Sequence, residues 1–280
     1  MRDVVLHRSA NKPKLGQHFL VDETACRAIV DALGDISTST VLEIGPGPGA
    51  ITRGLAQRAQ KLIAVELDEA LAEALERNYA ADGQMQVLRA DILQVDLDAL
   101  CNEHGVENLR IAGNLPYYIT SDILLWLFAQ WQRCSRAVLM MQEEVADRIA
   151  STPGRSEYGL LSATTQMHAH VEKLFSLPPE AFAPPPKVHS AVVRLHPAPR
   201  FEELKVERAA FEKFLRICFQ QKRKTLANNL RASGLEAERI ADALRGAAIE
   251  PGARAEALPL DAMAAIFHQL VSPHSSQPMA

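Results

Sequence analysis

Several short segments place glycines, carboxylates or an amide directly after apolar runs, where the strands of a parallel sheet would end. The first segment is Glu43–Gly49 (EIGPGPG), which precedes a helix-like stretch. Glycine lets the backbone turn sharply and lets a ligand approach without a Cβ in the way. Glu66 ends the next apolar run, and a carboxylate there can accept both hydroxyls of a ribose. Together the two segments predict a site for a cofactor that contains adenosine.

Two adenosine cofactors are compatible with this pattern, a nicotinamide dinucleotide and S-adenosylmethionine. Pro46 and Pro48 lack the backbone N–H groups on which a pyrophosphate cradle depends. Glu43, at the end of its strand, would also repel a diphosphate, whereas it suits a cofactor with an amino group and a sulfonium. We therefore expect S-adenosylmethionine as the cofactor, bound in part by Gly45 and Glu66.

Polar residues at the ends of the third and fourth apolar runs extend this site. Asp91 can accept a hydrogen bond from an adenine amino group, although a helix N-cap would explain the same residue. Asn114 can accept a hydrogen bond from an exocyclic amino group, with the Leu115 carbonyl as the second acceptor and Pro116 stiffening the turn. Two such acceptors would hold the nitrogen nearly tetrahedral, with its lone pair aimed at a methyl group. Tyr117 supplies a face on which a base can stack.

The elements that must position these residues follow from the apolar periodicity. Five runs are apolar at nearly every position, which is typical of strands buried on both faces of a parallel sheet. Helix-like stretches, including 51–59 and 67–79, lie between them, and 170–175 with 190–195 predict a closing hairpin. We predict a doubly wound α/β, Rossmann-like sheet with helices on both faces. The five runs are 41–44, 62–67, 86–88, 109–112 and 137–141.

A change of character near residue 200 predicts two domains. Residues 1–200 form the cofactor-binding domain, and 201–271 form a small all-helical domain with helices over 209–230, 236–244 and 260–270. The tail 272–280 is expected to be disordered. Cys218 lies in an apolar helical stretch and is expected in the core.

Composition and charge indicate a soluble protein that binds a polyanion. The 280 residues are 48% hydrophobic with a net charge of −4, and no segment is apolar enough for a signal peptide or a membrane span. The four cysteines form no CxxC pair, which argues against a zinc knuckle and against a disulfide scaffold. Residues 213–231 carry six Lys or Arg and no acid, and residues 1–20 carry four against one acid. Such segments can bind RNA phosphates, although a solvated helix face is the alternative.

Taken together, these motifs resemble those of the ribosomal RNA adenine dimethyltransferase family. Gln17–Leu20 and the proline-rich segment Phe182–Ser190 accompany the residues above in the family's order, from about residue 12 to the end of the helical region. The resemblance is greatest to the small-subunit (16S) branch. It implies a seven-stranded methyltransferase sheet, S-adenosylmethionine as donor, and dimethylation of two adjacent adenosines near the 3′ end of 16S RNA.

The resemblance also implies roles for particular residues. It places the cofactor contacts at His18, Leu20, Gly45, Glu66, Asp91 and Asn114. It places the catalytic group at Asn114, Leu115, Pro116, Tyr117 and Phe182, with Phe182 covering the target base opposite Tyr117. We expect a cytoplasmic monomer that acts on 16S rRNA in the small subunit or its precursor, with a role in subunit biogenesis and without a metal ion or membrane.

Two rival hypotheses remain at this point. The first is a large-subunit RNA methyltransferase of the macrolide-resistance type, which shares these motifs. Leu115, the run Pro184–Pro186 and the long basic helical region favour the small-subunit enzyme. The second is a non-catalytic ribosome-assembly factor, against which the intact set of Glu66, Asp91 and Asn114 argues.

Overall fold

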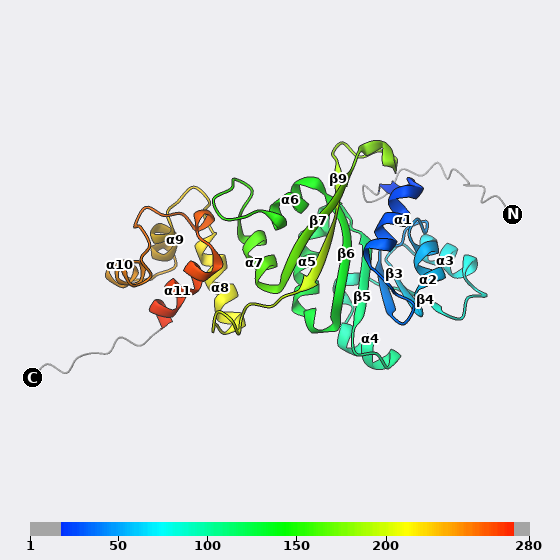
Figure 1. Ribbon diagram of the computed structural model, residues 1–280, viewed down its shortest axis with the longest axis horizontal. Coiled ribbons are helices and arrows are strands. Elements are labelled where there is room, and N and C mark those ends of the chain that lie inside the picture. The colour runs from blue at the N-terminus through cyan, green and yellow to red at the C-terminus, as the bar shows by residue number, and fades with distance from the viewer. Residues whose placement is uncertain (1–17, 272–280) are drawn as a thin grey trace, which may run out of the picture.

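The apolar runs form one mixed seven-stranded sheet, in the order β4-β3-β2-β5-β6-β9-β7 (Figure 1). The computed structural model describes residues 18–271. Strands β2 to β6 pair in parallel, and β9 pairs antiparallel with both β6 and β7, which confirms the parallel sheet and its closing hairpin. The strands are β2 (Thr40–Ile44), β3 (Lys61–Glu66), β4 (Met85–Arg89), β5 (Leu109–Asn114), β6 (Cys134–Gln142), β7 (Ala169–Leu177) and β9 (Ser190–Pro197).

Helices cover both faces of the sheet because alternate strand residues point to opposite sides. Val41 of β2 belongs to a buried cluster with residues of α1 and α2, whereas its neighbour Leu42 belongs to a cluster with residues of α4, α5 and α6. The sheet is therefore doubly wound, as predicted. These helices are α1 (Glu23–Ala32), α2 (Thr52–Arg58), α4 (Leu97–His104), α5 (Thr120–Ala129) and α6 (Glu143–Ala150).

Aspartates begin three of the helices. Asp22, Asp68 and Asp96 each accept hydrogen bonds from two backbone N–H groups in the first turn of the helix that follows. Such a cap satisfies donors that have no partner inside the helix. It also explains why α3 (Glu69–Asn78) begins two residues later than the predicted stretch, since Asp68 lies outside the helix as its cap.

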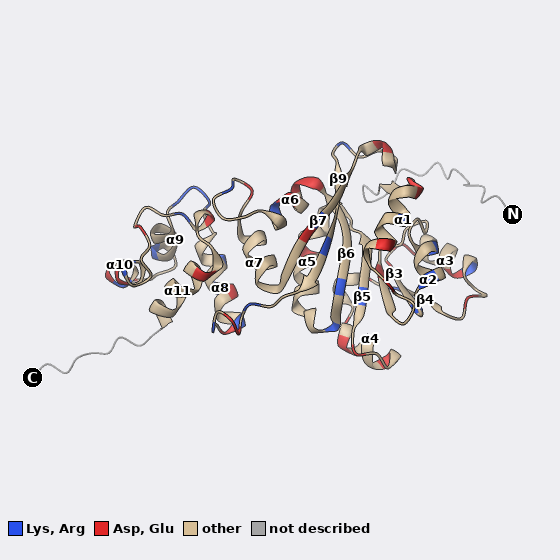
Figure 2. Cartoon of the chain, in the orientation of Figure 1, with Lys and Arg blue, Asp and Glu red and all other residues tan. Residues whose placement is uncertain are grey.

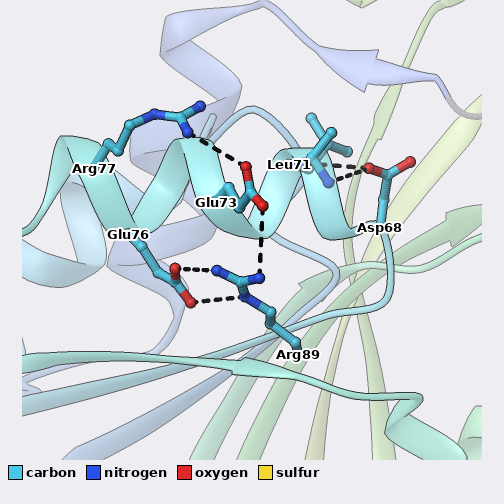
Figure 3. A network of polar contacts seen from close by, with 7 residues as sticks. Asp68, Leu71, Glu73, Glu76, Arg77 and Arg89 are labelled. Atoms are coloured by element: carbon cyan, nitrogen blue, oxygen red, sulfur yellow. Dashed lines mark hydrogen bonds and ion pairs between the residues drawn. The ribbon is translucent and has the colours of Figure 1, made fainter.

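An ion-pair network joins α3 to the end of β4 (Figure 3). Arg89 donates to both carboxylate oxygens of Glu76 and lies 3.7 Å from Glu73, which also pairs with Arg77. These side chains are substantially exposed, and each such pair contributes only about 0–1 kcal/mol. The network thus connects α3 with the strand that precedes Asp91 but contributes little to stability.

A small ribbon brings two distant segments together beside the sheet. Strand β1 (Phe19–Leu20) pairs antiparallel with β8 (Phe182–Ala183), and the Cα partners are Leu20 and Phe182, Phe19 and Ala183. The segment that begins at residue 18 is therefore fixed against the proline-rich loop between β7 and β9.

The region after residue 200 is helical, as predicted, but its first predicted helix was wrong. Instead of one helix over 209–230, the chain forms α8 (Arg208–Cys218) and α9 (Leu226–Ala232). Thr225 caps α9 by accepting from the Asn228 N–H, and the Asn229 side chain donates to the Cys218 carbonyl at 2.6 Å. These polar contacts end one helix and begin the next. The remaining helices are α10 (Ala237–Gly246) and α11 (Leu260–Val271).

These helices form a lobe at the β7 end of the sheet, and the lobe shares its core with α7 (Leu160–His168) (Figure 1). Tyr158, Ala163 and Met167 belong to the same buried cluster as Phe211 and Cys218, whose burial confirms the predicted core cysteine. The domain boundary at 200 stays a prediction, because residues before it contribute to this core. The predicted tail 272–280 and the basic residues of segment 1–17 lie outside the described part of the chain.

Candidate active site

A cleft of about 850 Å³, including the solvent space at its mouth, opens at the carboxyl ends of β2, β3, β4 and β5. The strand order reverses between β2 and β5, and ligands of open α/β sheets bind at such a point. The lining of the cleft includes His18, Gly45, Glu66, Asp91, Asn114, Leu115, Pro116 and Tyr117, all of them predicted site residues.

The glycine-rich turn after β2 forms one wall of the cleft. Gly45 and Gly47 have φ angles of 61° and 57°, which favour glycine because other residues are strained there. A Cβ on Gly47 would lie 3.1 Å from the Phe19 ring. The Gly47 N–H points away from the open space and donates to Glu66 at 2.9 Å.

Glu66 is held in place by backbone donors on two sides. Its Oε2 accepts from Gly47 N–H and its Oε1 accepts from Asp68 N–H, both at 2.9 Å. The residue is only 4% exposed, yet it lines the cleft. Each carboxylate oxygen keeps further acceptor capacity, so the carboxylate can still bind two hydroxyl groups of a ligand.

Asp91 is an N-cap and also a residue of the cleft lining. Its Oδ1 accepts from the Leu93 N–H at 3.0 Å and so caps a short 3₁₀ helix, Ile92–Gln94. The residue also lines the cleft. Within residues 18–271 no hydrogen bond uses its Oδ2, which leaves one carboxylate oxygen for a ligand.

Asn114 ends β5 with its side-chain amide oriented by a distant segment. Nδ2 donates to the His18 carbonyl at 3.0 Å, and because a carbonyl can only accept, this contact fixes which end of the amide is the nitrogen. No hydrogen bond in the described part of the chain uses Oδ1. Gly113 precedes it because a Cβ there would lie 2.8 Å from the Ile44 carbonyl oxygen on β2. Asn114 lines the cleft, and its Oδ1 remains available as an acceptor.

Tyr117 lines the same cleft through its ring. Its hydroxyl lies 2.6 Å from the Ser190 Oγ, and its ring stacks on His18 with centroids 5.8 Å apart. Burial raises the pKa of the Tyr117 phenol, and the bond to Ser190 offsets part of that rise. The His18 ring is itself tied to the Pro184 carbonyl at 2.8 Å.

Three residues lie elsewhere than the sequence-based hypotheses expect. Phe182 is 3% exposed and packs in a core cluster with Leu20, and it is not among the residues that line the cleft. The ring that stacks on Tyr117 is that of His18. The pairing of β1 with β8 buries the side chains of Leu20 and Phe182 against each other's strands. The cofactor contact predicted for Leu20 and the base contact predicted for Phe182 stay predictions. Glu43 is fully buried and bonds to Thr52 at 3.0 Å, so its side chain does not face the cleft.

Other cleft residues were missed by the sequence analysis. Leu67 and Tyr118 line the cleft and remain 55% and 58% exposed, although each directly follows a predicted site residue. Ser190, which does not line the cleft but bonds to Tyr117, was recognised in the sequence only as the last residue of the proline-rich segment Phe182–Ser190. Its signal was a polar residue at the start of the apolar run 190–195.

Comparisons with known proteins identify the family. The family model described as "Ribosomal RNA adenine dimethylase" matches residues 8–271. The chain belongs to this family. The resemblance seen in the motifs is thereby confirmed, and the protein is a ribosomal RNA adenine methyltransferase.

Two relatives match over nearly their whole lengths. "Ribosomal RNA small subunit methyltransferase A" of Acidobacterium capsulatum is 52% identical over 96% of this chain and 94% of that protein. The protein of the same name from Koribacter versatilis is 48% identical over 94% and 95%. Among solved structures, the 23S rRNA methyltransferase ErmE is 27% identical with a TM-score of 0.69, covering 90% of this chain and 99% of that one. A dimethyladenosine transferase from Plasmodium falciparum, at 24% identity and a TM-score of 0.75 over 89% and 96%, shares the fold.

Two further observations concern residues 18–271. No helix there is long and apolar enough to cross a membrane. No group of three His, Cys, Asp or Glu side chains in that range is arranged to hold a metal ion; His168, from the pair His168 and His170, instead bonds to Glu212 at 3.1 Å.

Proposed function

We propose that this methyltransferase uses S-adenosylmethionine to dimethylate the N6 amino groups of two adjacent adenosines near the 3′ end of 16S rRNA. It would act in the cytoplasm as a monomer, on the small subunit or its precursor. The observation that carries the proposal is the free Oδ1 of Asn114 at the cleft, with its amide fixed by His18. Relatives at 52% and 48% identity, named as small-subunit enzymes, support the choice of RNA.

The cleft has the groups that S-adenosylmethionine requires. Glu66 keeps acceptor capacity for two ribose hydroxyls, and Asp91 keeps Oδ2 for an adenine amino group. Val65, Leu67 and Ile92 supply apolar surface for the adenine ring. Gly45 and Gly47, which have positive φ angles, present no Cβ where the loop lines the cleft. When bound, the cofactor supplies an electrophilic methyl group on its sulfonium.

The protein's part in methyl transfer is to orient the adenine amino group. The Asn114 Oδ1 and the Leu115 carbonyl accept its two N–H bonds, which directs the nitrogen lone pair toward the methyl group. Pro116 stiffens the turn that carries both acceptors, and Tyr117 stacks on the base. No strong base is required, because the proton can leave once the nitrogen is cationic. Rate enhancement then arises mostly from positioning and desolvation.

The experiment that tests the proposal measures transfer of labelled methyl from S-adenosylmethionine to unmethylated 30S particles, with 50S particles as the control. Methylation of 30S alone is expected. Methylation of 50S instead would favour the large-subunit alternative, and the absence of transfer to both would favour an assembly factor. Cofactor binding by calorimetry separates an enzyme from a non-catalytic factor.

Glu66→Ala should weaken cofactor binding. The variant removes a buried, charged acceptor for the ribose, which is worth roughly 1.5–3 kcal/mol. Isothermal titration calorimetry with S-adenosylmethionine measures the change. Glu103→Ala, which removes an exposed carboxylate on α4, is the matched control and should leave the affinity unchanged. Equal affinities of the two variants would show that Glu66 only holds the loop.

A basic segment on the helical lobe is the proposed RNA contact (Figure 2). Its six cations are exposed, and they lie on α8, α9 and the turn between these helices. Lys222 also donates to the Ser156 carbonyl at 2.6 Å, which connects this turn to the α6–α7 loop. Exposed cations without buried partners can bind phosphates by counterion release. The six are Lys213, Arg216, Lys222, Arg223, Lys224 and Arg231.

Replacing Lys222, Arg223 and Lys224 with Ala should weaken binding to 30S particles and flatten its salt dependence. If each contacts one phosphate, the slope of log K against log salt should fall by about 2–3 units. A filter-binding series in increasing salt measures it, with cofactor affinity unchanged. A matched triple, Arg27, Arg58 and Arg77 to Ala, removes equal charge from exposed positions of the sheet domain. Identical slopes for both triples would identify the basic segment as a solvated face.

A further inference from the structure

Ser190 is a fully buried polar residue at the beginning of β9, the strand that lies between β6 and β7. Its Cα partners are Gln142 on β6 and Leu177 on β7. Its side chain is 0% exposed, and its Oγ lies 2.6 Å from the Tyr117 hydroxyl. A buried hydroxyl needs a hydrogen-bond partner, and the partner of Ser190 is the hydroxyl of Tyr117, whose ring lines the cleft.

Tyr117 is consequently fixed at both ends of its side chain. At the backbone, the turn is closed because Thr120 Oγ1 and Ile119 N–H both donate to the Pro116 carbonyl, at 3.0 and 3.2 Å. At the far end, the hydroxyl is attached to Ser190 on a strand with paired neighbours on both sides. The ring plane is thus determined by two elements that are 73 residues apart in sequence.

The neighbouring His18 ring does not hold a base against Tyr117 in this arrangement. A base between two rings needs about 7 Å between them, which is twice the contact distance of about 3.5 Å. The centroids of His18 and Tyr117 are 5.8 Å apart. An adenine must therefore displace His18 or use the other face of Tyr117, and in both cases the orientation of Tyr117 sets the plane of the base.

We infer that Ser190 is a positioning residue for methyl transfer: its hydroxyl fixes the Tyr117 ring so that the stacked adenine presents its amino group to Asn114. This inference rests on the proposed function, in which Tyr117 stacks on the target base. Ser190 touches neither the base nor the cofactor. It acts through the hydrogen bond to the Tyr117 hydroxyl.

Ser162 is the matched control for a buried serine that is purely structural. It is also 0% exposed, and its Oγ donates to the Arg148 carbonyl at 2.5 Å, on the α6–α7 side of the sheet and outside the cleft lining. Its Oγ also accepts from the Gly159 N–H at 3.1 Å, so Ser162→Ala removes one buried hydroxyl and two hydrogen bonds, whereas Ser190→Ala removes one buried hydroxyl and its bond to Tyr117. Ser162→Ala should therefore lower the thermal midpoint at least as much as Ser190→Ala.

The test compares Ser190→Ala, Tyr117→Phe, the double variant and Ser162→Ala in transfer of labelled methyl to unmethylated 30S particles. Ser190→Ala should lower kcat about 10–100-fold, since small misplacements of reacting groups are this costly. Its KM for particles should stay within about threefold, because phosphate contacts dominate RNA affinity. Tyr117→Phe keeps the ring and removes the same bond, so it and the double variant should match Ser190→Ala. Ser162→Ala should keep full kcat.

Each result decides the inference. Additive losses in the double variant, or equal kcat for Ser190→Ala and Ser162→Ala, would overturn it while leaving the proposed function intact. Wild-type enzyme that methylates neither 30S nor 50S particles would overturn the proposed function and this inference together. Should Ser190→Ala not fold, Tyr117→Phe removes the bond from its less buried partner and decides by the same criterion.

Discussion

Asn114→Ala should lower the rate of methyl transfer about 10²–10³-fold, which corresponds to roughly 2.7–4 kcal/mol, as removal of one preorganised hydrogen-bonding group does elsewhere. The variant removes the Oδ1 acceptor and also the Nδ2 donor that binds the His18 carbonyl at 3.0 Å. The Leu115 carbonyl and the Tyr117 ring remain. The interaction strengthens as the amino nitrogen gains positive charge, so the loss should appear mainly in the chemical step.

Single-turnover rates at saturating cofactor are the appropriate measurement for Asn114→Ala, because Asn114 also borders the proposed cofactor site. Binding to 30S particles should change little, since phosphate contacts lie elsewhere. Asn102→Ala, at an exposed position on α4, is the matched control and should retain the parent rate. A rate for Asn114→Ala within a factor of two of the parent would mean that Asn114 only shapes the turn after β5.

The sheet could be predicted from sequence because a parallel strand buried on both faces is apolar at nearly every position. β2 and β3 show this directly, since all but one of their residues are buried. The boundaries were less accurate. β6 begins at Cys134, three residues before the predicted start. The prediction missed these residues because Ser135 and Arg136 are polar, and they belong to the strand through backbone pairing with β5.

The break between α8 and α9 could not be predicted from apolar periodicity. The residues around Lys222–Lys224 keep helical spacing and high helix propensity. What ends α8 is tertiary and local polar chemistry: the Asn229 amide binds the Cys218 and Gln221 carbonyls, and Thr225 caps the next helix. A Thr three residues before an Asn was the available signal.

The site itself was partly predictable for a geometric reason. Glu66, Asp91 and Asn114 follow parallel strands, and the carboxyl ends of such strands meet at one edge. Contacts between remote segments were not predictable in this way. The pairing of Tyr117 with Ser190, and the burial of Phe182 in a cluster with Leu20, depend on how β1, β8 and β9 pair, which no local pattern encodes.

Glu43 should make the stability of the protein fall as pH rises. It is fully buried, its Oε1 accepts from the Thr52 hydroxyl, and its Oε2 has no partner among the described residues. Burial, with a smaller contribution from nearby Glu66, raises the pKa of Glu43 from 4.5 to about 8. The folded protein therefore holds this proton more tightly than the unfolded chain does. The resulting stability is complete below pH 4.5 and is lost as pH rises toward 8, by roughly 3 kcal/mol between pH 5 and 8.

Glu43→Gln isolates this effect because the amide stays neutral, has nearly the same shape and keeps an acceptor for Thr52. The free energy of unfolding, from urea titrations of parent and variant at pH 5 and pH 8, is the quantity to compare. The parent should lose roughly 3 kcal/mol more than the variant over this range, since every other titrating group is common to both. Parallel losses in the two proteins would mean that the folded state keeps Glu43 ionised, with water or a counter-charge reaching Oε2 through the glycine-rich loop.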